Sequence, residues 1–214
     1  MKTRTYEYLN DFFTKHSEMN YLRESIIKAV NIITDLKKEN KILVCGNGGS
    51  AADSAHISGE LLKSFMLKRL IPNELRTKLN NAYGEEGELI SNNLQQGIKC
   101  IPLTNFDAYN TAFANDCDPN FVFAQLVNAL GISGDCLIAI STSGNSKNVL
   151  YAAKLAKILG IKIIAMTGEH GGKLKDICDV LLNVPSNLVY KIQEYHLPIY
   201  HLLCLCVESE LFEE

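Results

Sequence analysis

Apolar residues along the chain alternate between short continuous runs and longer segments with helical spacing. The short runs are bounded by glycine or polar residues, which is typical of strands buried on both faces of a sheet. Five such strands are predicted, at residues 41–45, 99–103, 135–140, 161–166 and 180–184. Because helical segments separate these runs, the pattern predicts an α/β fold with a five-stranded parallel sheet flanked by helices.

The helical segments account for most of the remaining chain. Residues 3–39 predict two helices with a break near residues 17–20. Further helices are predicted at residues 50–65, 121–130, 146–159 and 188–211, with a helical stretch after residue 103 and a short helix at 172–178. We therefore expect a single domain over residues 1–214, in which residues 1–40 form N-terminal helices.

Residues 66–98 interrupt the alternation of strands and helices. They are polar, carry little apolar content, and include Pro72, Gly84 and Gly87. Residues 75–79 and 89–94 are the only parts with a short helical pattern. We interpret residues 66–98 as a helical insertion that lies over the surface.

Two Gly/Ser-rich turns join a predicted strand to a predicted helix. They are Gly46–Ser50 (GNGGS) and Ser141–Ser146 (STSGNS), and Ser146 is placed as the N-cap of the helix that follows. Glycine lets the backbone approach an anion closely, and the first N–H groups of a helix favour negative charge. One such turn is usually only a turn. Two at the carboxyl edge of one parallel sheet predict a phosphate site.

Other nucleotide-binding motifs are disfavoured. The first turn does not match G-x-G-x-x-G, and no acidic residue closes the next strand at Leu103, so a dinucleotide site is not expected. The chain also lacks the G-x-x-x-x-G-K-[ST] motif that cradles nucleoside triphosphates.

Composition and charge indicate where in the cell the protein is found and which kinds of ligand it does not bind. The net charge is −3 with no long run of one sign, which argues against nucleic acid as the main ligand. Seven cysteines, an odd number found mostly in apolar runs, suggest reduced core residues. The N-terminus lacks a signal-peptide core, and no uncharged apolar stretch reaches 18 residues. We expect a cytoplasmic protein without a membrane partner.

Four polar residues on two predicted helices form a second candidate constellation. His56 and Glu60 are four residues apart on the helix after the first turn, and Gln193 and His201 are eight apart on the last helix. Together they could bind a metal through N and O ligands, or supply a carboxylate base and an imidazole acid. Spacing alone favours an ordinary helix-surface pair, because His/Glu pairs at i, i+4 are common.

Several segments taken together resemble a known family. GNGGSAADSAH (46–56), ISTSGNSKNV (140–149), TGEHGGK (167–173) and KIQEYHLPIYH (191–201) are similar to bacterial phosphoheptose isomerases, members of the sugar isomerase (SIS) domain group. Asn115-Asp116 before a Phe-rich helix also fits. The resemblance extends over nearly the whole chain except residues 66–98.

The resemblance implies a fold, a reaction and a site. The fold would be a SIS-type, flavodoxin-like three-layer sandwich, assembled as a homotetramer with sites at subunit interfaces. The enzyme would convert sedoheptulose 7-phosphate into D-glycero-D-manno-heptose 7-phosphate, a precursor of the heptose in lipopolysaccharide or capsule. Glu60 would be the general base and His201 its acid partner, and zinc would bind to His56, Glu60, Gln193 and His201. The substrate and its phosphate would contact Asn47, Gly48, Gly49, Ser50, Asn115, Asp116, Ser141, Thr142, Ser143, Ser146 and Gln193.

Two departures from the family keep other functions open. The segment between Glu60 and Thr104 is about twenty residues longer than the family pattern, and Phe106 stands where the family usually has Asp, with Asp107 beside it. We therefore expect recognition of the substrate hydroxyls to differ. One alternative is an isomerase of another phosphosugar. Another is a non-catalytic SIS protein that binds a replication initiator, although such a protein would not need all four residues of the second constellation.

Overall fold

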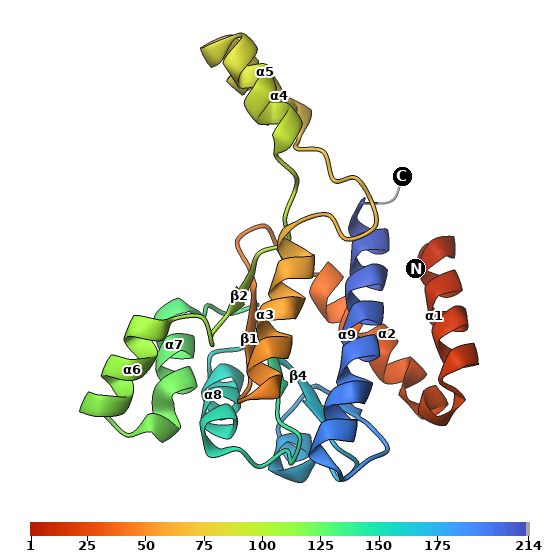
Figure 1. The fold of residues 1–214 in the computed structure, drawn as a ribbon, viewed down its shortest axis with the longest axis vertical. Coiled ribbons are helices and arrows are strands. Elements are labelled where there is room, and N and C mark those ends of the chain that lie inside the picture. The colour runs from red at the N-terminus through yellow and green to blue at the C-terminus, as the bar shows by residue number, and fades with distance from the viewer. Residues whose placement is uncertain (213–214) are drawn as a thin grey trace.

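The five predicted strands form one parallel sheet in the computed structural model, which describes residues 1–212 (Figure 1). The strands are β1 (Ile42–Cys45), β2 (Cys100–Pro102), β3 (Cys136–Ile140), β4 (Lys162–Thr167) and β5 (Val180–Asn183), in the order β2-β1-β3-β4-β5. The predicted fold class is confirmed. Ile42 in β1 is in register with both Cys100 and Cys136, so β1 lies between β2 and β3.

The strand order creates a switch point at β1 and β3. The chain leaves β1 toward β2 on one side of the sheet, and the later strands are added on the other side of β1. Ligands of open parallel sheets bind in the crevice outside the carboxyl ends of the strands at such a point. The GNGGS turn follows β1 and the STSGNS turn follows β3, so the topology brings the two turns to that crevice.

Helices cover both faces of the sheet. One core joins alternate strand residues to α1 (Thr3–Lys15), α2 (Arg23–Thr34), α3 (Gly49–Leu62) and α9 (Val189–Phe212). The other core joins the intervening strand residues to α6 (Asp107–Asp116), α7 (Val122–Leu130) and α8 (Lys147–Ile158). The 3₁₀ segments are η1 (Ser17–Leu22), η2 (Pro119–Phe121) and η3 (Gly172–Asp176). The strands are apolar on both sides because both sides are packed.

The insertion differs from the prediction that it lies over the surface. Its two helices, α4 (Asn73–Tyr83) and α5 (Glu85–Asn93), form a hairpin that stands away from the rest of the molecule, at the top of Figure 1. Its polar character has a physical reason, since solvent surrounds the hairpin. We call residues 73–93 the arm.

Two sequence expectations concern the environment of the chain. All seven cysteines are free thiols, and five of them are buried. Within residues 1–212, none of the helices combines the length and the apolar character needed to cross a membrane.

Candidate active site

The two Gly/Ser turns enclose a cavity of about 350 Å³ at the start of α3 and α8. It is lined by Asn47, Gly48, Gly49, Ser50, Ile140, Ser141, Thr142, Ser146, Val189 and Gln193. The structure thus brings together seven predicted phosphate or substrate residues of the two turns, with Gln193 from α9. Two helices begin here with N–H groups that have no partner within their own helix. We call this cavity the cradle.

The hydroxyls of the second turn are held by one another. Ser141 Oγ donates to Ser146 Oγ at 3.0 Å, and the Ser143 hydroxyl accepts from the N–H of Asn145 at 3.1 Å. Ser146 is the N-cap residue of α8, as predicted, but its side chain makes no capping hydrogen bond. Its hydroxyl instead stays within the cradle, where a phosphate oxygen can accept its proton.

The side chain of Gln193 on α9 approaches the first turn closely at Gly49. A Cβ added there would lie 2.5 Å from Gln193 Nε2, well inside van der Waals contact. Gly48, the N-cap of α3, has φ +56°, which other residues rarely adopt. These two glycines let the amide of Gln193 reach the cradle.

The second constellation lies further along the same pair of helices. Ile57 and Leu61 of α3 are 0% and 1% exposed and seat the helix on the sheet. His56 and Glu60 lie beside this buried face, with side chains 42% and 15% exposed, and His56 Nε2 is 3.2 Å from Glu60 Oε1. The ring of His201, on α9, lies 5.0 Å from that of His56 and nearly perpendicular to it. The structure thus brings the side chains of His56, Glu60 and His201 together.

Polar contacts hold this cluster in place. Lys63 Nζ is 3.3 Å from Glu60 Oε2, so both oxygens of the carboxylate have a partner. His56 Nδ1 is 2.9 Å from the hydroxyl of Tyr200, which is 1% exposed. His201 Nε2 is buried and has no partner within residues 1–212. An unpaired buried nitrogen costs free energy unless a ligand or ion satisfies it.

His201, Tyr200 and Asp53 have shifted pKa values. Burial lowers the pKa of His201, the nearby His56 lowers it further, and Glu60 opposes both, so His201 is neutral near pH 7. Burial raises the pKa of Tyr200, and the charge of Asp53 and a hydrogen bond with it raise that pKa further. Burial also raises the pKa of Asp53, against the lowering effects of Tyr200 and His56.

The cradle and the cluster are related by the direction of two adjacent helices. α3 and α9 lie side by side and leave the carboxyl edge of the sheet in the same direction (Figure 1). Ser50 and Gln193 lie near their starts, and Glu60 and His201 lie about 15 and 12 Å further along, at 1.5 Å per residue. The arrangement suits an extended ligand with a phosphate at one end.

Comparisons with known proteins agree with this geometry. A SIS domain family model matches residues 7–97 and 101–168. The phosphoheptose isomerase of Helicobacter pylori (strain Shi470) is 38% identical over 92% of each chain. The solved phosphoheptose isomerase structures from Neisseria gonorrhoeae and Francisella tularensis have TM-scores of 0.72 and 0.74, with 33% and 31% identity. They cover 96% and 98% of this chain, and the chain covers 97% and 100% of theirs.

The chain belongs to the phosphoheptose isomerases of the SIS domain family. The family match also runs through residues 66–97, which the motifs alone had left outside the resemblance.

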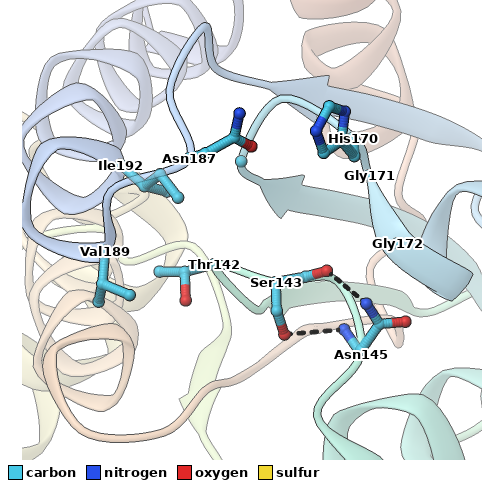
Figure 2. Close-up of a pocket in the computed structure, with 10 residues that line it drawn as sticks. Thr142, Ser143, Asn145, His170, Gly171, Gly172, Asn187, Val189 and Ile192 are labelled. Atoms are coloured by element: carbon cyan, nitrogen blue, oxygen red, sulfur yellow. Dashed lines mark hydrogen bonds between the residues drawn. The ribbon is translucent and has the colours of Figure 1, made fainter.

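A second cavity, of about 270 Å³, lies beside the cradle (Figure 2). It shares Thr142 and Val189 with the cradle and is bounded on its far side by His170 and Asn187. Ser143 lines this second cavity and not the cradle. The predicted phosphate residue Ser143 therefore faces the second cavity, and the wall between the two spaces is formed by Thr142 and Val189.

The four predicted zinc ligands do not converge on one point in the single chain. Gln193 lies beside Gly49 in the cradle, while His56, Glu60 and His201 form the cluster. Within residues 1–212, no three His, Cys, Asp or Glu side chains converge closely enough to hold a metal ion. The unpaired nitrogen of His201 and the N and O donors beside it nevertheless suit zinc.

Other predicted substrate residues lie apart from the cradle in the single chain. Asn115 and Asp116, at the end of α6, are exposed, and Asn115 donates a hydrogen bond to Asp116 at 2.8 Å. Phe106 packs partly against the core as the N-cap residue of α6. Neither Asn115 nor Asp116 lines the cradle, so their predicted contact with substrate stays a prediction.

Sequence reasoning missed three residues of the site. Asp53 and Tyr200 support His56, and Asn148 exchanges two hydrogen bonds of 2.9 Å with Asn47, which ties the two turns together. Asp53 could have been found from its position three residues before His56 on one helix face. The contacts of Tyr200 and Asn148 join residues more than 100 positions apart, so no local signal reveals them.

Proposed function

We propose that this chain isomerises sedoheptulose 7-phosphate to D-glycero-D-manno-heptose 7-phosphate through an enediolate. The observation that supports this most is the pairing of the cradle with an acid–base cluster one ligand length away on α3 and α9. A phosphate held in the cradle would direct the sugar chain along these helices toward Glu60. Binding energy at the remote phosphate would then position the reacting carbons.

Glu60 is the residue assigned to move the proton. A carboxylate placed over C1 and C2 can take the proton from C1 of the ketose and return it to C2. Its contacts with His56 and Lys63 orient both oxygens. Between these steps the negative charge resides on the enediolate oxygens and needs a hydrogen-bond donor or a cation.

His201 is assigned as the partner of Glu60. Its lowered pKa makes it a neutral imidazole at pH 7, so it acts through an N–H that moves to a substrate oxygen and back. Its Nε2 has no other partner within the described residues. This atom would contact a substrate oxygen in metal-free protein and the ion in zinc-loaded protein.

We also propose zinc, held by His56, Glu60 and His201. Gln193, the fourth predicted ligand, lies in the cradle in the single chain, and its amide would have to turn toward the cluster to bind the ion. Zinc would supply a Lewis acid for the enediolate oxygens. Elemental analysis of protein purified without chelator should find about one zinc per chain, and full activity with none bound would refute this proposal.

A homotetramer with sites at subunit interfaces is the proposed assembly. The His56 side chain is 42% exposed in the single chain, and neither His56 nor Glu60 lines the cradle. A neighbouring subunit would supply the missing wall. We place the enzyme in the cytoplasm, where its free thiols remain reduced.

The decisive experiment follows aldose formation from sedoheptulose 7-phosphate. Glu60→Gln should lower kcat by about 10²–10⁴, the usual contribution of a general base. Glu39→Gln, at an exposed turn residue that belongs to neither the cradle nor the cluster, is the matched control and should leave kcat unchanged. No turnover by the unmodified protein would refute the proposed reaction.

A panel of ketose phosphates tests the substrate separately. If another ketose phosphate has a kcat/KM above that of the heptulose, the chain is an isomerase of another phosphosugar. If no ketose phosphate is turned over, the hypothesis to test next is a non-catalytic role in binding a replication initiator.

A further inference from the structure

The arm has no contact with the body of the protein that could bury its apolar residues. It stands clear of the sheet and its flanking helices (Figure 1). α4 has 11 residues and α5 has 9, and helices this short are marginal in water unless another surface packs on them. The arm therefore depends on the contact between its two helices or on a contact outside the chain.

The base of the arm is fixed rather than hinged. Leu70 and Gln95 form a bridge between the two connecting segments, and the Gln96 N–H donates to Arg69 O at 2.8 Å. The side chain of Arg69 forms an ion pair of 2.7 Å with Glu208 of α9, with exposures of 0% and 1%. The arm is thus held at a set position relative to α9.

The contact between α4 and α5 is made of small and polar residues. A Cβ added to Gly87 would lie 2.1 Å from the backbone oxygen of Leu79, so the helices nearly touch there. Ser91, one turn later, is 1% exposed and lies 3.5 Å from Asn80 Oδ1. Almost no apolar area is buried between the helices.

The large apolar residues of the arm point outward instead. Leu75, Tyr83, Leu89 and Ile90 are 43%, 61%, 64% and 38% exposed. Leu75, Leu79 and Tyr83 follow one another at spacing four and form one stripe on α4. Asn80 on α4 and Gly87 on α5 face each other across the contact. Tyr83 follows Asn80 by three residues, and Ile90 follows Gly87 by three residues. Because α4 and α5 are antiparallel, the same rotation about each helix axis puts Tyr83 and Ile90 on the same side of the arm.

We propose that this apolar side pairs with the same side of the arm in a second copy of the chain. A two-fold axis brings a surface onto itself, so an apolar stripe meets an apolar stripe. The charges fit this arrangement, because α4 carries Arg76 and Lys78 against one glutamate, Glu74, whereas α5 carries three glutamates at positions 85, 86 and 88 and no cation. Placing α4 of one copy on α5 of the other forms a bundle of four helices with a shared apolar core.

This contact is separate from the interfaces proposed for the active site, and its test does not depend on turnover. Tyr83→Glu combined with Ile90→Glu puts charge on the apolar side. Thr77→Glu combined with Asn81→Glu, which adds the same two charges at exposed positions of α4 off the stripe, is the matched control. Sedimentation equilibrium should show association weakened by about 30-fold or more in the double variant and unchanged in the control.

Chemical cross-linking locates the contact. In a background with Cys117 and Cys178, the two cysteines that are not buried, changed to Ser, Ile90→Cys treated with a bismaleimide should give a covalent dimer. Asn81→Cys should not. Absence of the dimer at position 90, or equal yields at both positions, would overturn the proposal whatever the mass measurement shows, and would leave a foreign partner for the arm.

Discussion

The buried ion pair between Arg69 and Glu208 offers the sharpest test of how the structure is held together. Glu208 accepts hydrogen bonds from the N–H groups of Phe65, Met66 and Leu67 at 2.7–3.0 Å and from Arg69 Nε at 2.7 Å. Arg69 in turn donates to the backbone oxygen of Leu61 at 2.8 Å. One carboxylate thus joins the end of α3, the base of the arm and α9.

The expected cost of breaking this pair follows from its burial. Glu208→Gln keeps the shape but leaves the charge of Arg69 buried without a counter-charge, which costs about 3–5 kcal/mol. For a chain of this size, about 2–4 °C in Tm is lost per kcal/mol, so Tm should fall by about 6–20 °C. An exposed pair provides the scale for comparison. Lys15 and Asp11 are 2.8 Å apart and about two-thirds exposed, and Lys15→Gln should cost about 0.5 kcal/mol or less.

Thermal and urea unfolding of Glu208→Gln and Lys15→Gln measure these losses of stability. A double-mutant cycle with Glu208→Gln, Arg69→Met and their combination gives the coupling free energy of the buried pair, which should exceed about 1 kcal/mol. If Glu208→Gln costs no more than Lys15→Gln, the pair is not the buried connection described here, and the fixed base of the arm is wrong.

The pH dependence of this contribution has a definite sign. Burial raises the pKa of Glu208, but the three N–H groups and Arg69 lower it by more, so the net pKa lies below the ordinary 4.5. The stability that Glu208 contributes is therefore complete above pH 4.5 and is lost as the pH falls below it. The stability of Glu208→Gln should depend less on pH in that acid range.

Three further predictions concern single residues. Burial lowers the pKa of His196 to about 4, although a hydrogen bond to Thr167 opposes this shift. The stability that neutral His196 contributes is therefore complete above pH 6.5 and is lost as the pH falls toward 4. Between these pH values, the free energy of unfolding in urea should change with pH by the equivalent of about one proton, and His196→Gln should remove this dependence. An unchanged pH dependence in the variant would count against the assignment. Gly49→Ala should displace Gln193 and lower kcat/KM roughly tenfold or more with unchanged Tm, and a wild-type value would mean that Gln193 has no role in positioning. Ser141→Ala removes a hydroxyl that lines the cradle and orients the Ser146 hydroxyl. On the proposed function it should raise KM about 10- to 100-fold, whereas the exposed Ser17→Ala should not.

Several features of this protein follow from local sequence because local physics sets them. The apolar runs mark strands that are packed on both faces, and all five were found within one or two residues of their bounds. The turns at Gly46–Ser50 and Ser141–Ser146 need glycine and hydroxyl residues at defined positions. His56 and Glu60 meet because four residues make about one helical turn.

Only the tertiary structure decided which distant residues meet. The switch point between β1 and β3, which brings both turns to one crevice, depends on sheet order. Eight residues of helix separate Gln193 from His201 by about 12 Å, so Gln193 lies in the cradle and His201 in the cluster with His56. The outward direction of the arm depends on contacts at its base between residues more than 100 positions apart, such as Arg69 and Glu208. Periodicity records which face of each element is buried, but not which element covers it, and that choice is made by packing of the whole chain.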